Sequence, residues 1–148
     1  ANAAAKMVDG QQMDLDGEGR QTSVEALENI HQNKTGAMIC VSARSGAIIA
    51  EASESDLDAV TKYAASLGLL FQITDDLLDV TQTTEILGKT AGKDLTAEKS
   101  TYPAFYGIEE TRRLAEKVHT KAVSSLKNLK HNAEILRELA DFILDRKS

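Results

Sequence analysis

The sequence has little proline, few aromatic residues and a single cysteine, and each shortage excludes a class of protein. Its 148 residues include one Pro, no Trp, three Tyr and three Phe. A β-sandwich needs many turns and many aromatic or β-branched strand residues, so this composition argues against an all-β fold. The lone cysteine, Cys40, excludes a disulfide framework within the chain and a cysteine-rich zinc site.

Long apolar runs and an excess of positive charge are also missing. No stretch approaches the roughly 18 to 20 apolar residues that span a bilayer, and residues 1–15 lack the charged head and apolar middle of a signal peptide. The 23 acidic residues outnumber the 17 basic ones, for a formal charge of -6. General nucleic-acid binders carry a basic excess that neutralises phosphates. We therefore expect a soluble, cytoplasmic protein with no membrane span and no nucleic-acid partner.

The spacing of apolar residues predicts an all-α protein. Helical spacing is found in the residues before a charged, glycine-containing break at 16–20, and then over about 24–50, 56–80, 109–129 and 132–145. We expect a kink or short interruption at Lys34-Thr35-Gly36 and a loop from Thr81 to Pro103. No repeat, linker or boundary divides the chain, so the sequence predicts one helical-bundle domain over residues 1–148.

The expected helix at 56–80 carries two local signals. Ser55 is placed to cap its first turn, with Asp58 at the third helical position. Gly68 lies inside the apolar ladder, where glycine costs up to about 1 kcal/mol relative to alanine. The close approach of a neighbouring helix is the simplest reason for a glycine at that position.

A polar stripe near the end of this helix is the strongest functional signal. Asp75 and Asp79 are four residues apart and Asp76 and Asp79 three apart, so the carboxylates share one side of the helix, with Gln72 one turn earlier. Like charges at these spacings destabilise a helix unless a cation faces them. Oxygen ligands suit Mg²⁺, which completes its coordination with water and phosphate oxygens. A solvated acidic face is the alternative, and the acidic pattern alone does not decide between them.

Lysines in glycine-bearing segments provide a second signal. The segment 88–94 (GKTAGKD) and then Lys99 follow the carboxylates, and Lys34-Thr35-Gly36 precedes them. Lysines in such segments act as point charges on phosphate oxygens, and a helix interruption can turn backbone groups toward a cavity. Taken singly, each segment is equally typical of a solvated loop or a simple turn.

Taken together and in order, five motifs resemble the second half of the all-trans polyprenyl diphosphate synthases, in particular farnesyl and geranylgeranyl diphosphate synthases. The motifs are Gly10-Gln11…Asp14, Lys34-Thr35-Gly36, Phe71-Gln72…Asp75-Asp76…Asp79, Gly88-Lys89…Asp94 and Lys99…Thr101-Tyr102-Pro103. Their order and spacing extend the similarity over essentially the whole chain. The resemblance implies an all-α helical bundle of the isoprenoid synthase type, of which this chain supplies the C-terminal half.

The resemblance also implies roles for the matching acidic and basic residues. Asp75, Asp76 and Asp79 match the family's second aspartate-rich motif, which with Mg²⁺ holds the diphosphate of the allylic substrate. Lys34 and Lys89 match lysines that contact the same diphosphate.

Further matches concern the surroundings of that diphosphate. Lys99 matches a lysine near the site. Thr35 and Gln72 match polar residues whose oxygens face the developing allylic cation. Gln11 and Asp14 match a polar pair on the helix that lines the cavity.

The implied reaction joins isopentenyl diphosphate to dimethylallyl, geranyl or farnesyl diphosphate, and yields farnesyl or geranylgeranyl diphosphate. Metal ions and lysines stabilise the departing diphosphate, and a water-poor helical cavity protects the carbocation. Arg146 loosely resembles a basic residue that approaches the isopentenyl diphosphate in some members. The family also implies a homodimer.

The main departure from the family is the absence of its first half, which holds an earlier aspartate-rich motif. We expect this chain to be the C-terminal part of a longer polypeptide that also contains the missing half, and to be inactive alone. The alternative is that the missing half resides on another chain. A non-catalytic subunit and a helical interaction module are the other functions that the sequence leaves open.

Overall fold

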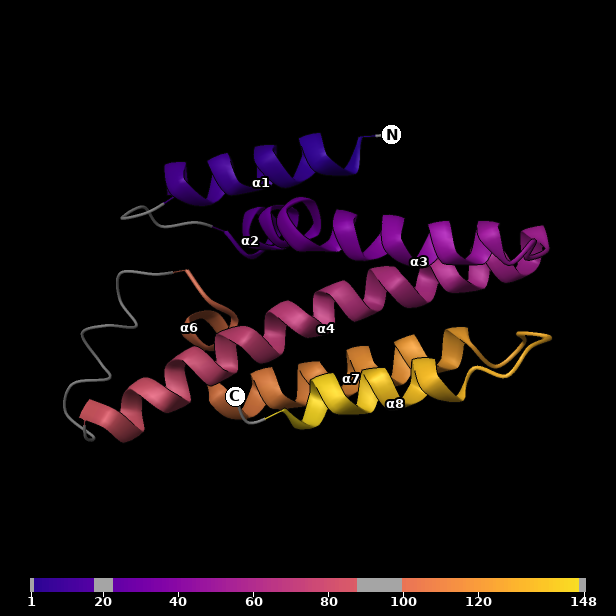
Figure 1. The fold of residues 1–148 in the computed structure, drawn as a ribbon. Helices are drawn as coiled ribbons and strands as arrows, with labels where there is room; N and C mark the ends of the chain where they lie inside the picture. Colours follow the sequence, from indigo (N-terminus) through magenta and orange to yellow (C-terminus); the bar gives the residue numbers. More distant parts are fainter. Residues whose placement is uncertain (1, 18–22, 88–99, 147–148) are drawn as a thin grey trace.

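A computed structural model describes residues 2–17, 23–87 and 100–146, and within these ranges it contains helices and no strand (Figure 1). The elements in chain order are α1 (Ala3–Gly17), α2 (Val24–His31), the π-helical turn η1 (Gln32–Gly36), α3 (Ala37–Ile49), α4 (Glu54–Leu87), α6 (Tyr102–Tyr106), α7 (Ile108–Ser125) and α8 (Glu134–Asp145). The all-α prediction is confirmed. None of the described helices is long and apolar enough to cross a membrane.

The long helix α4 is the centre of the fold. α3 packs along one side of it and α7 with α8 along the other, while α1 lies against η1 and α3 (Figure 1). The buried apolar cluster includes Tyr63, Leu67, Leu70, Ile73, Leu77, Ala115, Val118, Ala122, Ala140 and Ile143. Burial of this apolar face, more than helix propensity, stabilises the arrangement. The core therefore fixes α4 as the support for the polar residues on its other sides.

Tyr63 ties α8 to α4. It is only 1% exposed, and its hydroxyl donates a hydrogen bond of 2.6 Å to the carbonyl oxygen of Leu136. Burial raises the pKa of Tyr63 to about 12, and the nearby Asp141 carboxylate adds to the effect. The phenol therefore stays protonated and keeps donating this hydrogen bond throughout the neutral pH range.

The start of α4 differs from the sequence prediction. Ser53, not Ser55, caps the first turn, because its hydroxyl accepts a hydrogen bond from the Asp56 backbone N–H at 3.2 Å and donates one to Asp56 Oδ2 at 2.9 Å. Ser53 and Asp56 have the same spacing as Ser55 and Asp58. The two candidate caps are therefore equivalent in sequence, and only the fold separates them.

The prediction of a loop from Thr81 to Pro103 is wrong at both ends, because helices extend into this range from each side. α4 continues to Leu87, and Thr81 is accommodated because its hydroxyl donates to the carbonyl of Leu77 at 2.8 Å. Near the other end of the predicted loop, the Thr101 hydroxyl accepts a backbone N–H of α6 at 3.3 Å and caps that short helix. α7 ends at Ser125, a few residues earlier than the apolar pattern predicts.

The expected interruption at Lys34-Thr35-Gly36 is a π-helical turn, so the chain stays helical on both sides of it. Glycines let two other helices approach this turn. A Cβ atom on Gly10 of α1 would lie 2.8 Å from Lys34 Cα, and one on Gly68 of α4 would lie 2.9 Å from Gly36 Cα. Real Cβ atoms do not come this close to a neighbouring backbone. The prediction that Gly68 marks a close helix approach is confirmed.

Candidate functional site

Asp75 on α4 is paired with the residue that follows α8. Its half-exposed carboxylate accepts a hydrogen bond at Oδ1 from Arg146 Nη2 at 2.9 Å. The same nitrogen donates to the carbonyl oxygen of Phe71 at 3.1 Å, and Arg146 Cζ lies 4.2 Å from the centroid of the Phe71 ring. The Arg146 side chain is only 12% exposed. The charge of Asp75 is thus balanced in this structure by a well-packed arginine.

The neighbouring Asp76 turns into the protein. It is 7% exposed, and its Oδ2 accepts a hydrogen bond from the Tyr102 backbone N–H at 2.9 Å. Because Tyr102 begins α6, Asp76 fixes this short helix beside α4. Asp79, one turn further along, is exposed. Within the described part of the chain, no group of three His, Cys, Asp or Glu side chains is placed to hold a metal ion by itself.

A second charged pair joins η1 to α1. Lys34 Nζ lies 2.5 Å from Asp14 Oδ2, and each side chain is 33% exposed. Asp14 is one helical turn beyond Gly10, the residue at which the α1 backbone touches the Lys34 backbone. The close backbone contact therefore sets the position of the ion pair, and two predicted site residues are brought together.

Contact between Gly68 and Gly36 relates the two charged pairs in space. Gly68 lies two helical turns before Asp75, and therefore on the same side of α4. Gly36 directly follows Lys34 and Thr35 in η1. The turn that carries Lys34 thus packs against α4 on the side that carries Asp75.

The other predicted site residues have mixed placements. Gln72 is 8% exposed on α4, one turn before the aspartates. Thr35 is half-buried in η1, and Gln11 is exposed on α1. Lys89 and Lys99 lie outside the described residues, so their roles stay predictions.

The sequence gives little indication of the contacts made by Asp75 and Asp76. Arg146 is 71 positions away from Asp75, and only a loose family resemblance singles it out. The partner of Asp76 is a backbone N–H, which every residue except proline possesses. No side-chain signal could have found that second contact.

The donor set fits a hard divalent cation that also binds phosphate oxygens. Asp75 and Asp79 supply carboxylates one helical turn apart, and Mg²⁺ is usually held by one or two carboxylates together with substrate phosphates. Arg146 contacts only Oδ1 of Asp75. Oδ2 of Asp75 is outside that contact. A cation could therefore bind Oδ2 while Arg146 stays at Oδ1, although the two would compete for the charge of the carboxylate.

Comparison with known sequences gives a consistent result. The family model described as polyprenyl synthetase matches residues 1–139. Geranylgeranyl diphosphate synthase of Cyanophora paradoxa is 43% identical over 141 residues, which are 95% of this chain and 47% of that protein. Farnesyl diphosphate synthase of Escherichia coli K12 is 43% identical over an alignment of 150 positions, which covers 99% of this chain and 50% of that protein. The chain thus spans about half the length of these curated relatives.

Solved structures share the fold. A polyprenyl synthase from Caulobacter crescentus CB15, complexed with calcium and isoprenyl diphosphate, superposes with a TM-score of 0.84 at 26% identity, covering 100% of this chain and 58% of that one. Geranylgeranyl pyrophosphate synthetase from Pyrococcus horikoshii Ot3 gives 0.82 at 26% identity, covering 98% and 56%. The helices described above are therefore arranged as in these larger proteins.

Proposed function

The chain belongs to the polyprenyl synthetase family, and from this we propose that it forms part of a prenyltransferase that joins isopentenyl diphosphate to an allylic diphosphate. The allylic substrate is dimethylallyl, geranyl or farnesyl diphosphate, and the product is farnesyl or geranylgeranyl diphosphate. The names of the relatives support this choice. The observation that carries the proposal is the packing of η1, with Lys34, against the Asp75 side of α4. In this proposal one diphosphate would contact the Lys34 ammonium group directly and the Asp75 carboxylate through Mg²⁺.

In the proposal the carboxylates bind the metal ion, and the lysines bind the diphosphate directly. In the proposal Asp75 and Asp79 hold Mg²⁺, which when bound supplies Lewis-acid stabilisation of the departing diphosphate. Lys34 adds a fixed positive charge at the same group, and Lys89 adds another. Asp14 holds the Lys34 ammonium group in place through the 2.5 Å ion pair. Charge is therefore positioned before the substrate arrives, which avoids reorganisation during the reaction.

Uncharged polar residues are proposed to lie next to the allylic carbon whose bond to the diphosphate oxygen breaks. Thr35 and Gln72 direct oxygen atoms toward the allylic carbon, where positive charge develops when the carbon–oxygen bond breaks. By resemblance to the family, we assign Gln11 of α1 to the wall of the substrate cavity and Lys99 to the binding of the diphosphate. Asp76 is a positioning residue in this scheme, because its carboxylate holds the start of α6.

Other parts of the protein complete the proposed enzyme. The chain spans about half the length of its relatives, so we assign the binding of isopentenyl diphosphate to a further polypeptide segment and propose a homodimeric assembly. Large exposed apolar side chains on α1 support the proposal that further protein packs against this helix. Val8 is 61% exposed and Leu15 51% exposed. Exposed apolar side chains of this size on one helix are typical of surfaces that contact other protein.

The test of this function is a ligand-stabilisation experiment. Mg²⁺ and inorganic diphosphate added together are expected to raise the unfolding temperature more than the sum of their separate effects, because each completes the binding site of the other. Differential scanning calorimetry measures the shift, with EDTA plus diphosphate as the control. Purely additive shifts in a protein whose circular dichroism spectrum shows it to be folded would contradict the proposal and favour a non-catalytic role.

Arg146 supplies a separate prediction. Substituting Arg146→Gln is expected to tighten divalent-cation binding by up to about fivefold, because an ion pair worth up to about 1 kcal/mol no longer competes for Asp75. Titration with Mn²⁺, followed by electron paramagnetic resonance in the absence of diphosphate, measures the affinity directly. Arg113→Gln is the matched control, since Arg113 pairs with Glu110 on the exposed side of α7. Weaker Mn²⁺ binding in Arg146→Gln would mean that the arginine orients Asp75 rather than competing for it.

A further inference from the structure

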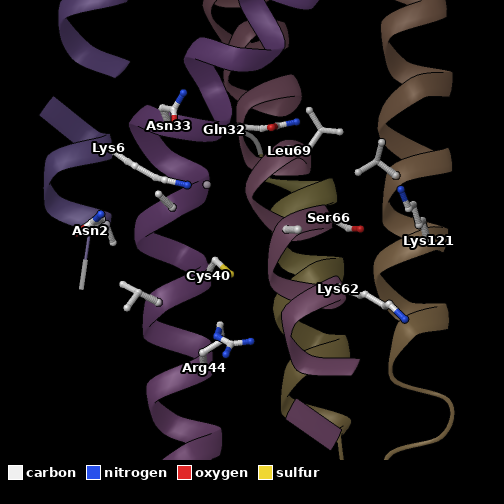
Figure 2. A pocket seen from close by; sticks show the side chains of 16 residues that line it. Asn2, Lys6, Gln32, Asn33, Cys40, Arg44, Lys62, Ser66, Leu69 and Lys121 are labelled. Carbon is white, nitrogen blue, oxygen red and sulfur yellow. The ribbon is translucent and has the colours of Figure 1, made fainter. Parts of the chain in front are cut away.

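A cavity lies among α1, η1, α3, α4 and α7 (Figure 2). It borders the proposed active site at η1, where Gln32, Asn33 and Gly36 line it, but its described lining includes none of the residues proposed to bind the metal ion or the diphosphate. Its volume is about 700 Å³, within the usual range for small-molecule sites. Asp75, Lys34 and Asp14 are not among the described residues that line it. On α4 it is lined by Lys62, Ala65, Ser66 and Leu69, which precede the aspartates along the helix.

Positive side chains surround this cavity. Lys6 of α1, Arg44 of α3, Lys62 of α4 and Lys121 of α7 line it, and Figure 2 shows them on four different helices. The described lining residues include no Asp or Glu. This local gathering of cations contrasts with the net charge of -6 of the whole chain. Cations from several elements around one hollow favour the binding of an anion.

The existing contacts of these cations leave them able to bind an anion. Lys62 pairs with Asp58 at 2.6 Å, but the two side chains are 66% and 60% exposed, and such a pair is weak in water. Arg44 donates from Nη1 to the Thr61 hydroxyl at 2.5 Å, which holds the guanidinium at α4 without neutralising its charge. The cationic character of the cavity is therefore retained.

The interior of the cavity is mainly apolar. Val41 and Cys40 of α3, Leu69 of α4 and Val118 of α7 line it, together with small residues such as Ala65. Each methylene group removed from water at such a surface contributes about 0.8 kcal/mol. The cavity therefore offers an apolar surface for a hydrocarbon chain beside cations for a charged head.

We propose that this cavity binds an amphiphilic phosphate or diphosphate ester whose apolar chain contacts the α3 and α4 residues. The head is attracted by the cations that line the cavity, and the site needs no metal ion because its positive charge comes from side chains. Prenyl diphosphates have this chemistry, and choosing them as the ligand rests on the proposed function. The binding site itself does not, since it shares none of the proposed catalytic residues.

The test uses geranyl diphosphate as the probe, titrated calorimetrically into the metal-free chain in EDTA. Lys6→Gln combined with Lys121→Gln is expected to weaken binding by about tenfold, because it removes two of the four positive charges that line the described part of the cavity. The matched control is Lys117→Gln with Lys127→Gln, two exposed lysines outside the cavity lining, which removes the same total charge. Ala65→Phe, which fills the cavity from an exposed helical position, is expected to weaken binding by a similar factor.

Other arms of the experiment identify the ligand. Inorganic diphosphate and geraniol are each expected to bind at least about tenfold more weakly than geranyl diphosphate, because each lacks one half of the recognised structure. Binding to vesicles of phosphatidic acid, weakened by the same variants, would keep the site but assign it to membrane lipid. The proposal is overturned if the control pair weakens binding as much as the cavity pair, or if the metal-free chain binds none of the probes. Asp75→Asn is expected to retain this binding, which separates failure here from failure of the proposed function.

Discussion

Replacing Asp75 by asparagine is expected to abolish the joint stabilisation by Mg²⁺ and diphosphate, with a loss of at least about tenfold in their combined affinity. A neutral amide is a poor ligand for a hard cation. The substitution also leaves the 12% exposed Arg146 side chain without its ion-pair partner, although the new amide oxygen can still accept the Arg146 hydrogen bond, so we expect the free energy of unfolding to fall by about 1 kcal/mol. Calorimetric titration of Mg²⁺ in the presence of inorganic diphosphate measures the affinity, and urea unfolding measures the stability.

The adjacent aspartate provides the control for this experiment. In Asp76→Asn the amide oxygen can still accept the Tyr102 N–H, so ligand binding should change little. Asp76→Ala leaves that buried N–H without its acceptor and is expected to cost about 1–3 kcal/mol of unfolding free energy. Equal losses of affinity in Asp75→Asn and Asp76→Asn would show that both carboxylates bind the metal, contrary to the orientation of Asp76 in the structure.

Substituting Gly10→Ala is expected to destabilise the protein by about 1–3 kcal/mol. The new methyl group would meet the backbone of Asn33 and Lys34, which cannot rotate out of the way as a flexible side chain could. α1 must then move away from η1, and the ion pair between Asp14 and Lys34 should weaken with it. Thermal and urea unfolding followed by circular dichroism measure the loss of stability.

A second helical glycine makes the comparison direct. Gly46 of α3 has nothing within 4 Å of the position of an added Cβ atom. Gly46→Ala is therefore expected to stabilise the protein by up to about 1 kcal/mol, because alanine is the better helix former. If both substitutions changed the free energy of unfolding in the same direction, helix propensity rather than the contact of α1 with η1 would control the effect at Gly10.

Much of the helical architecture could be predicted because apolar periodicity depends only on local sequence. The ladder of α4 and the tight packing at Gly68 follow from spacing and from the size of one residue. The ends of α4 could not be predicted, because Ser53 and Ser55 are equivalent caps in sequence and Thr81 suits either a helix or a loop. Such choices are decided by packing against other helices.

The candidate site shows a similar division. The spacing of Asp75, Asp76 and Asp79 predicts three carboxylates on one side of a helix, but consecutive residues differ in direction by about 100°, and in the structure Asp76 turns inward, away from the other two. Which of two adjacent aspartates faces inward depends on where α6 lies, and α6 is fixed by a contact 26 positions away. Pairings at such separations follow from the complete fold, so the sequence could name the charged residues but not their partners.

The π-helical turn at Gln32–Gly36 has a consequence for how α2 and α3 are related. Such a turn contains one residue more than an α-helical turn, and this extra residue changes the rotational phase of everything after it by about 100°. The buried residues Leu27 and Ile30 of α2 are therefore rotated about the helix axis, relative to α3, from the direction that an unbroken α-helix would give them. Deleting a single residue within this turn would restore a regular α-helix and rotate Gly36 away from Gly68. The contact between the two glycines would then be lost although neither glycine had been substituted.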